Sequence, residues 1–280
     1  LGPNHATGTG FTQTKAYLYS IDNDTLEETG NDPDPYPADC ALAWTGEYAL
    51  ALGGQLEDGS LSTYATVWDP SYATDFDLGH WYTSSENFLL EGRANPQAIT
   101  LDNGKVLLIG GRRLVSSNTF DPDNIGTPLA SCEVITPDPT FATATIRTGP
   151  MTYGRFAFGM VKLPDGRVLV VGGIGCKPCQ PVVTISLQYV NELTSCEIYD
   201  PSLGYWSPIS NTLDPHSYCT CGYDANTNRV YVVGGAQSKK VEYLDLNTMT
   251  WHYSIAELSN HSYRGCGSMV GHIEGDPVAY

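Results

Sequence analysis

The stretch RVLVVGG, residues 167–173, is a hydrophobic run that ends in two glycines, and it recurs along this chain of 280 residues. A tight-turn signal, Pro164-Asp165-Gly166, precedes it, and another short apolar run comes before the turn. Two apolar runs joined by such a turn predict a β-hairpin. The paired glycines let the backbone leave the second strand in conformations that a Cβ atom would forbid. Equivalent runs are EYALALGG (47–54), KVLLIGG (105–111) and RVYVVGG (229–235).

The repeat has a regular period and predicts four strands in each unit. The first glycines of the pairs are Gly53, Gly110, Gly172 and Gly234, which lie 57, 62 and 62 residues apart. After each pair we expect a third strand, followed by a fourth strand marked by an aromatic residue. Four strands in a unit of about 60 residues are typical of a β-propeller blade. The third strands are TYATVWDP (63–70), SCEVITPDP (131–139), SCEIYDP (195–201) and VEYLDLNT (241–248), and the aromatic residues are Trp81, Phe141, Trp206 and Trp251.

These features together resemble the kelch repeat. The shared features are the strand that ends in Gly-Gly, a later Tyr or Asp, and an aromatic residue six positions on, as from Asp200 to Trp206 and from Asp245 to Trp251. The resemblance covers essentially the whole chain and is strongest over residues 153–253. Long insertions in some repeats, and the lack of Trp in the second, depart from the usual kelch pattern. The resemblance implies an all-β, kelch-like β-propeller with four-stranded antiparallel blades.

A regularly spaced arginine extends the count of blades. Arg93 precedes Gly110 by 17 residues, and Arg155 precedes Gly172 by 17. Arg264 repeats this position and predicts a further pair of glycines 17 residues later, near position 281. The sequence therefore predicts that a fifth blade begins close to the C-terminus.

We expect the two ends of the chain to supply the two halves of this fifth blade. Residues 259–280 would supply its first two strands, and residues 1–30 its third and fourth. Closure within one molecule gives a ring without open sheet edges, whereas closure between molecules gives a polymer, because a head-to-tail contact that does not close propagates. A third interpretation is that the chain is part of a longer propeller, and the ring and the longer propeller are favoured over the polymer. We expect one five-bladed domain over residues 1–280, with whole blades at approximately 36–90, 91–150, 151–212 and 213–258.

Charge and apolar content narrow the functional classes. The chain has 31 acidic and 14 basic residues, which gives a net charge of -17. This argues against nucleic-acid binding, since phosphates select for Lys and Arg, and against anionic membrane surfaces for the same reason. The sequence contains no uninterrupted run of 18 apolar residues, so we expect no membrane insertion.

The cysteines suggest a secreted, extracellular protein. Eight is an even number, and an oxidising compartment is favoured over a cytosolic set of buried thiols. Glycosylation sequons at Asn23 and Asn260 are compatible with secretion. A disulfide that pins a long loop is favoured over zinc at Cys176 and Cys179, because zinc needs four soft ligands. The disulfide candidates, whose pairing stays open, are Cys40, Cys132, Cys176, Cys179, Cys196, Cys219, Cys221 and Cys266.

Five arginines are the candidate ligand-binding residues. The loops that join the second and third strands share a face of a propeller with the starts of the blades. Arg112 and Arg113 directly follow a pair of glycines, and Arg93, Arg155 and Arg264 mark the starts of blades. The kelch resemblance implies that such arginines hold a peptide or an anionic ligand. The alternatives are solvated loop charge for the first two and a structural role for the other three.

We expect a non-enzymatic extracellular propeller that acts in binding or assembly. Its partner would be a protein or glycan on the long-loop face, or further copies of the chain joined through the divided blade into a filament. The alternative is a secreted carbohydrate-active or degenerate copper-oxidase-like propeller enzyme. The six histidines contain no adjacent pair for copper, and no opposed carboxylates stand out for glycoside hydrolysis. We therefore assign no catalytic residue, cofactor or metal.

Overall fold

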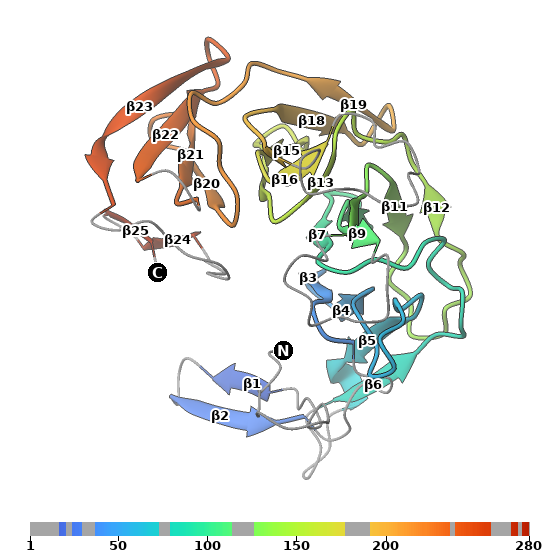
Figure 1. Ribbon diagram of the computed structural model, residues 1–280. Helices are drawn as coiled ribbons and strands as arrows, with labels where there is room; N and C mark the ends of the chain where they lie inside the picture. The colour runs from blue at the N-terminus through green and yellow to red at the C-terminus, as the bar shows by residue number, and fades with distance from the viewer. Residues whose placement is uncertain are drawn as a thin grey trace. The chain divides into compact units, whose positions relative to one another are not determined.

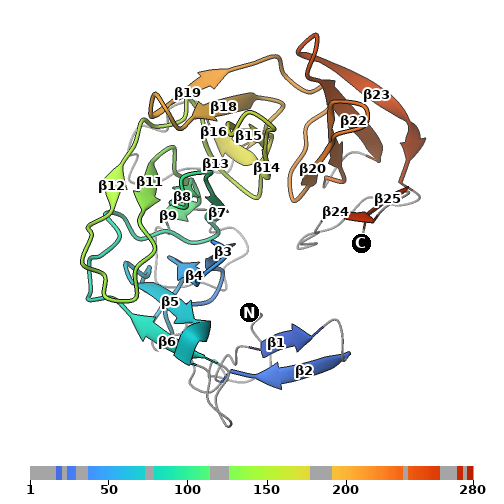
Figure 2. The ribbon, with the colours of Figure 1, turned by 180° about the vertical axis from the view of Figure 1, so that it is seen from behind.

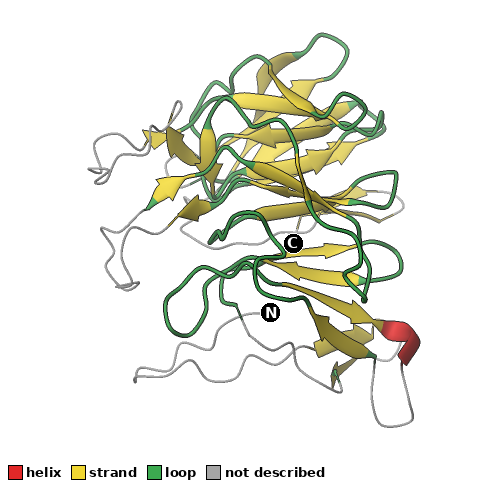
Figure 3. Ribbon diagram, turned by 90° about the vertical axis from the view of Figure 1, so that its right-hand side faces the viewer, coloured by secondary structure: helices red, strands yellow, loops and turns green. Residues whose placement is uncertain are grey.

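Strands make up nearly all of the regular structure. A computed structural model describes residues 17–20, 24–29, 37–72, 79–113, 126–176, 191–235, 239–258, 270–273 and 276–279 (Figure 1). The helical element within these ranges is a single 3-10 turn, η1 (Pro70–Tyr72), drawn red in Figure 3. No helix of the described ranges has the length and apolar character needed to cross a bilayer. Two compact units divide the chain: Leu1–Gly126 with Cys132–Arg147, and Thr127–Ser131 with Thr148–Tyr280.

The first unit contains two four-stranded antiparallel sheets. The first sheet has the strand order β3-β4-β5-β6, and the second sheet has the order β12-β11-β8-β7. Leu50, Leu52 and Val67 of the first sheet form a core with Val106 and Leu108 of the second. The strands are β3 (Ala41–Trp44), β4 (Ala49–Leu52), β5 (Ala65–Asp69), β6 (His80–Thr83), β7 (Gln97–Thr100), β8 (Val106–Ile109), β11 (Cys132–Ile135) and β12 (Ile146–Arg147), with β1 (Tyr17–Ser20), β2 (Thr25–Glu28) and β9 (Arg112–Arg113) outside these sheets.

The second unit repeats this plan with a third sheet, β14-β15-β18-β19, and a fourth, β20-β21-β22-β23 (Figure 2). Leu169, Val171 and Ile198 of the third sheet form a core with Val230 and Leu244 of the fourth. The strands are β14 (Gly159–Lys162), β15 (Val168–Val171), β18 (Cys196–Asp200), β19 (Tyr205–Pro208), β20 (Thr220–Asp224), β21 (Arg229–Val233), β22 (Lys240–Asp245) and β23 (Thr250–Glu257), with β10 (Thr127–Pro128), β13 (Gly154–Phe156), β16 (Ile174–Cys176), β17 (Asn191–Glu192), β24 (Val270–Ile273) and β25 (Asp276–Ala279) outside these sheets.

The runs that end in two glycines form the second strand of each sheet. Every residue of β8 and β15 is buried. A strand covered on both faces needs apolar residues at each position, which explains why these runs lack the polar alternation of a one-sided strand. The glycines then turn the chain out of the sheet: Gly172 and Gly173 have φ values of 63° and 97°. A Cβ atom on Gly172 would lie 2.2 Å from the carbonyl oxygen of His216, so only glycine fits there.

The all-β prediction is confirmed, because four four-stranded antiparallel sheets within the described residues are consistent with a β-propeller-like fold. The number of blades, their boundaries and their closure stay predictions. The placement of Phe141 in a fourth strand was wrong. Phe141 lies in a turn with a φ of 51°, and its ring packs edge-on against Phe88 at 5.2 Å. The fourth strand of the second sheet is β12, which follows this turn.

Candidate functional site

Arg93 is buried in a charge pair at the start of the second sheet. Its Nη2 donates to Oε1 of Glu133 at 2.6 Å, and its Nη1 donates to the carbonyl oxygen of Gly110 at 2.9 Å. Neither side chain of the ion pair is exposed to solvent. The arginine therefore joins the third strand of the sheet, which carries Glu133, to the end of the second strand.

Arg155 repeats this arrangement in the third sheet. Its Nη2 donates to Oε1 of Glu197 at 2.7 Å, and its Nη1 donates to the carbonyl oxygens of Gly172 and Ser195 at 2.7 and 2.8 Å. The exposed fractions of the two charged side chains are 0% and 1%. The spacing of 17 residues to the glycine thus has a physical cause, since it brings the guanidinium to that glycine's carbonyl.

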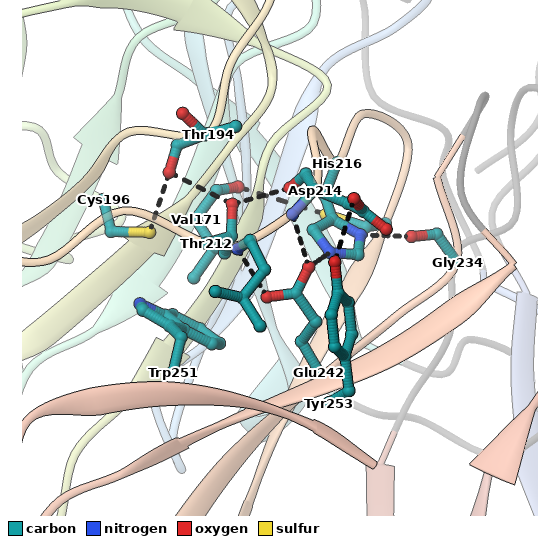
Figure 4. Close-up of polar contacts among 12 residues, drawn as sticks. Val171, Thr194, Cys196, Thr212, Asp214, His216, Gly234, Glu242, Trp251 and Tyr253 are labelled. Carbon is teal, nitrogen blue, oxygen red and sulfur yellow. Dashed lines mark hydrogen bonds and ion pairs between the residues drawn. The ribbon is translucent and has the colours of Figure 1, made fainter. Parts of the chain in front are cut away.

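His216 replaces arginine in the fourth sheet (Figure 4). Its Nδ1 lies 2.7 Å from the carbonyl oxygen of Gly234, and its Nε2 lies 3.0 Å from Oε1 of Glu242. Both side chains of this pair are fully buried. Sequence reasoning missed His216 because it searched for arginine, and because the spacing to Gly234 is 18 residues.

The three glutamates also hold the chain segment that enters each sheet. Glu133 accepts from the backbone N–H of Leu90 at 2.8 Å. Glu197 accepts from the N–H groups of Thr152 and Tyr153. Glu242 accepts from those of Leu213 and Asp214 in the same way. Each buried carboxylate is therefore paired with a basic side chain and accepts from backbone donors, as a charge removed from water requires.

The structure corrects the ligand-binding prediction for Arg93 and Arg155. Both are fully buried and hydrogen-bonded within the sheets, so they do not present charge to a ligand on a loop face. Arg112 Nε donates to Oδ1 of Asn95 at 2.9 Å. Arg113 forms an ion pair with Glu91, and its side chain is 57% exposed. Arg264 lies outside the described residues.

The pairing of His216 predicts a pH-dependent stability. Burial disfavours its charged form, but the hydrogen bonds to Glu242 and to the Gly234 carbonyl outweigh this and raise the pKa of His216. A raised pKa in the folded state contributes stability below the unfolded value of about 6.5, and this contribution is lost as the pH rises through the folded value. We expect the difference in unfolding free energy between the wild type and His216→Gln to shrink from pH 6 upward in urea titrations. A difference that stays constant across this range would contradict the assignment.

In the first sheet, threonine stands at the position of the glutamate. Thr66 pairs with Ala51, two residues before Gly53, just as Glu133 pairs with Leu108, two residues before Gly110. Thr66 is buried, and its Oγ1 donates to the carbonyl oxygen of Ala51 at 3.4 Å. The second, third and fourth sheets thus have a charged glutamate at this position, where it binds the segment that enters the sheet. The first sheet has a neutral threonine there.

The face of the first sheet that bears Thr66 forms an apolar pocket of ≈ 880 Å³, within the usual range for a binding site. Trp44, Trp68 and Trp81 contribute rings from three strands, and Tyr17 and Thr29 line it from the N-terminal segment. The outer rings are covered: Trp68 and Trp81 are 6% and 8% exposed, and Trp81 Nε1 donates to Thr29 Oγ1 at 3.2 Å. By contrast, Trp44 on the edge strand β3 is 53% exposed. Most of the described residues that line the pocket are aromatic or aliphatic, and Glu47 adds one charged side chain.

The described cysteines correct most of the disulfide prediction. Cys40, Cys132, Cys196, Cys219 and Cys221 carry thiols. Burial raises the pKa of Cys40 to about 11 and that of Cys196 to about 12, so both stay protonated at neutral pH. Cys132 and Cys196 occupy equivalent positions in separate sheets. Cys176 differs, because it is disulfide-bonded.

Several predicted sites lie outside the described residues: Cys179, Cys266 and the sequon residues Asn23 and Asn260. Within the ranges that the structure does describe, no three His, Cys, Asp or Glu side chains gather as a metal site.

Comparison with known proteins supports the fold and leaves the function open. No family model matches the chain, and no curated protein matches it. A solved structure of YjhT is similar, with a TM-score of 0.56 and 14% sequence identity, over 80% of this chain and 67% of that chain. A likeness at this identity concerns the fold alone, so the relation to kelch repeats stays a prediction.

Proposed function

We propose that this chain is a non-enzymatic, extracellular, kelch-like propeller that acts in binding or assembly, and that its copies join head to tail through a divided fifth blade. The observation that carries the proposal is the contrast between the inner sheets and the terminal hairpins. Among the described residues, the four inner sheets have four strands each, whereas β1-β2 and β24-β25 are separate sheets of two strands. An isolated hairpin is marginally stable in water, and each of its open edges is a template for another strand.

The buried charges favour assembly over anion binding at the loop face. Arg93 and Arg155 are paired with Glu133 and Glu197 inside the sheets, so these arginines stabilise the sheets. Among the predicted ligand residues that the structure describes, Arg113 has a side chain that is mostly in solvent. A protein or glycan that contacts the loop face would meet Arg113, while the joining of copies would rest on backbone pairing and apolar burial.

Sedimentation velocity on the full-length protein tests this function. The weight-average mass is expected to rise with concentration from that of one chain, 30.3 kDa, through successive multiples, because a head-to-tail contact does not saturate at a dimer. A mass that stays at one chain over the whole accessible range of concentration would contradict the assembly function.

A further inference from the structure

The face of the first sheet that carries Thr66 corresponds to a packed face in the other sheets. In the second sheet, the equivalent face presents Val106 and Leu108, which pack against the first sheet. In the fourth sheet it presents Val232, Leu244 and Trp251, which pack against the third. In both, the face that carries the glutamate is covered by the sheet that precedes it in the chain. No complete sheet precedes the first one within the described residues, so its equivalent face has only partial cover.

One half of this face is buried and the other half is exposed. Strands β5 and β6 present Trp68 and Trp81, which are buried, with Trp81 hydrogen-bonded to Thr29 next to the β1-β2 hairpin. Strand β3 presents Leu42 and Trp44, which are 49% and 53% exposed. The outer half of the face is thus covered, while the inner half presents large apolar side chains to solvent. Leu42 and Trp44 both line the apolar pocket, so their exposed surface is continuous with it.

The two strands that would cover the inner half are those of the C-terminal segment. Residues 14–22 and 25–29 are expected to supply the third and fourth strands of the divided blade, and they precede the sheet whose outer half is covered. Residues 259–280 are expected to supply the first and second strands, and β24-β25 within them is a two-stranded sheet that pairs with no other described strand. A hairpin of this kind would cover the face of strands β3 and β4.

We propose that Leu42 and Trp44, with the adjoining wall of the pocket at Ala49, form the seat for the C-terminal segment 259–280 of a second copy of the chain. This proposal rests on the assembly function and names its contact surface. The contact is apolar. The chain carries a net charge of -17, so two copies repel each other, and an interface between acidic surfaces would be disfavoured.

The first test replaces Trp44 by aspartate in the full-length protein. Association measured by sedimentation is expected to weaken by about 30-fold or more, as for an aromatic residue at the centre of an interface. Trp44 is half exposed, so the thermal unfolding midpoint of the variant should stay close to that of the wild type. Leu203→Asp is the matched control, because Leu203 is 59% exposed in a turn of the third sheet, and its association is expected to be unchanged.

The second test identifies the occupant. A photoreactive benzoylphenylalanine at position 44 is crosslinked in a mixture of isotopically heavy and light full-length chains, and the products are mapped by mass spectrometry. The proposal predicts heavy-to-light crosslinks to residues 259–280. Crosslinks to this segment only within one chain would overturn it in favour of a closed ring, and crosslinks elsewhere would overturn the occupant.

The outcomes separate this proposal from the function it rests on. If the wild type assembles and Trp44→Asp assembles equally well, the seat is wrong while the assembly function stands. If the wild type never exceeds the mass of one chain, the assembly function itself fails.

Discussion

Replacing Arg155 by leucine is expected to lower the free energy of unfolding by about 3–5 kcal/mol, the loss typical when one partner of a buried ion pair is removed. The change leaves Glu197, whose side chain is 1% exposed, as a buried carboxylate with backbone donors alone. It also removes the donor from the carbonyl oxygens of Gly172 and Ser195, which accept at 2.7 and 2.8 Å. Urea denaturation, followed by tryptophan fluorescence, measures the effect.

Two further variants make this prediction specific to the buried charge. Arg167→Leu removes a cation that lies 2.7 Å from Asp165, but these side chains are 40% and 50% exposed, so the loss should stay below about 1 kcal/mol. Adding Glu197→Gln to Arg155→Leu should recover part of the stability, because the amide oxygen still accepts from Thr152 and no uncompensated charge remains. A single Arg155→Leu variant as stable as Arg167→Leu would show that the pair does not hold the sheet.

Trp251→Ala is expected to destabilise the protein by about 3–5 kcal/mol, the usual loss for a large aromatic side chain removed from a core. Trp251 is 6% exposed and packs in the core between the third and fourth sheets. Its Nε1 donates to the carbonyl oxygen of Ser210 at 2.9 Å. Thermal unfolding of the variant and the wild type provides the comparison.

Trp206 supplies a matched control for the hydrogen bond of Trp251. It occupies the equivalent fourth-strand position in the third sheet and is 7% exposed, but its Nε1 is buried without a hydrogen-bond partner among the described residues. We expect Trp251→Phe to cost about 1 kcal/mol more than Trp206→Phe, which is the net value of one hydrogen bond. Equal costs for the two changes would mean that the bond to Ser210 contributes nothing.

The repeat was readable from the sequence because its strands are specified locally. The turn before each pair of glycines, the apolar run and the later aromatic residue are all properties of short segments, and the strands β8, β15 and β21 follow them closely. Phe141 was misplaced because an aromatic ring suits a turn as well as a strand when it has another ring to contact. Its partner, Phe88, lies 53 residues earlier in the chain, where no local pattern points to it.

Only some residues of the candidate site could be predicted from the sequence. The spacing of Arg93 and Arg155 marked a repeated position, but the partners of these side chains lie 40 and 42 residues away. The glutamates were visible in the third strands, in SCE at 131–133 and 195–197 and in KVE at 240–242. Each of these glutamates follows a pair of glycines, and a basic residue lies 17 or 18 positions before the first glycine of that pair. A search for any basic residue at this spacing, and not for arginine alone, would have found His216. The exposure of Trp44 depends on which strands pack over the first sheet, so it could be learned only from the fold.

Electron microscopy of the full-length protein at high concentration shows directly whether its copies join, because images distinguish joined particles from single ones. We expect linear chains of propeller-sized particles, which shorten into separate particles in the Trp44→Asp variant and persist in Leu203→Asp. Uniform, separate particles for the wild type at every concentration would contradict the claim that copies of this chain join through the divided blade.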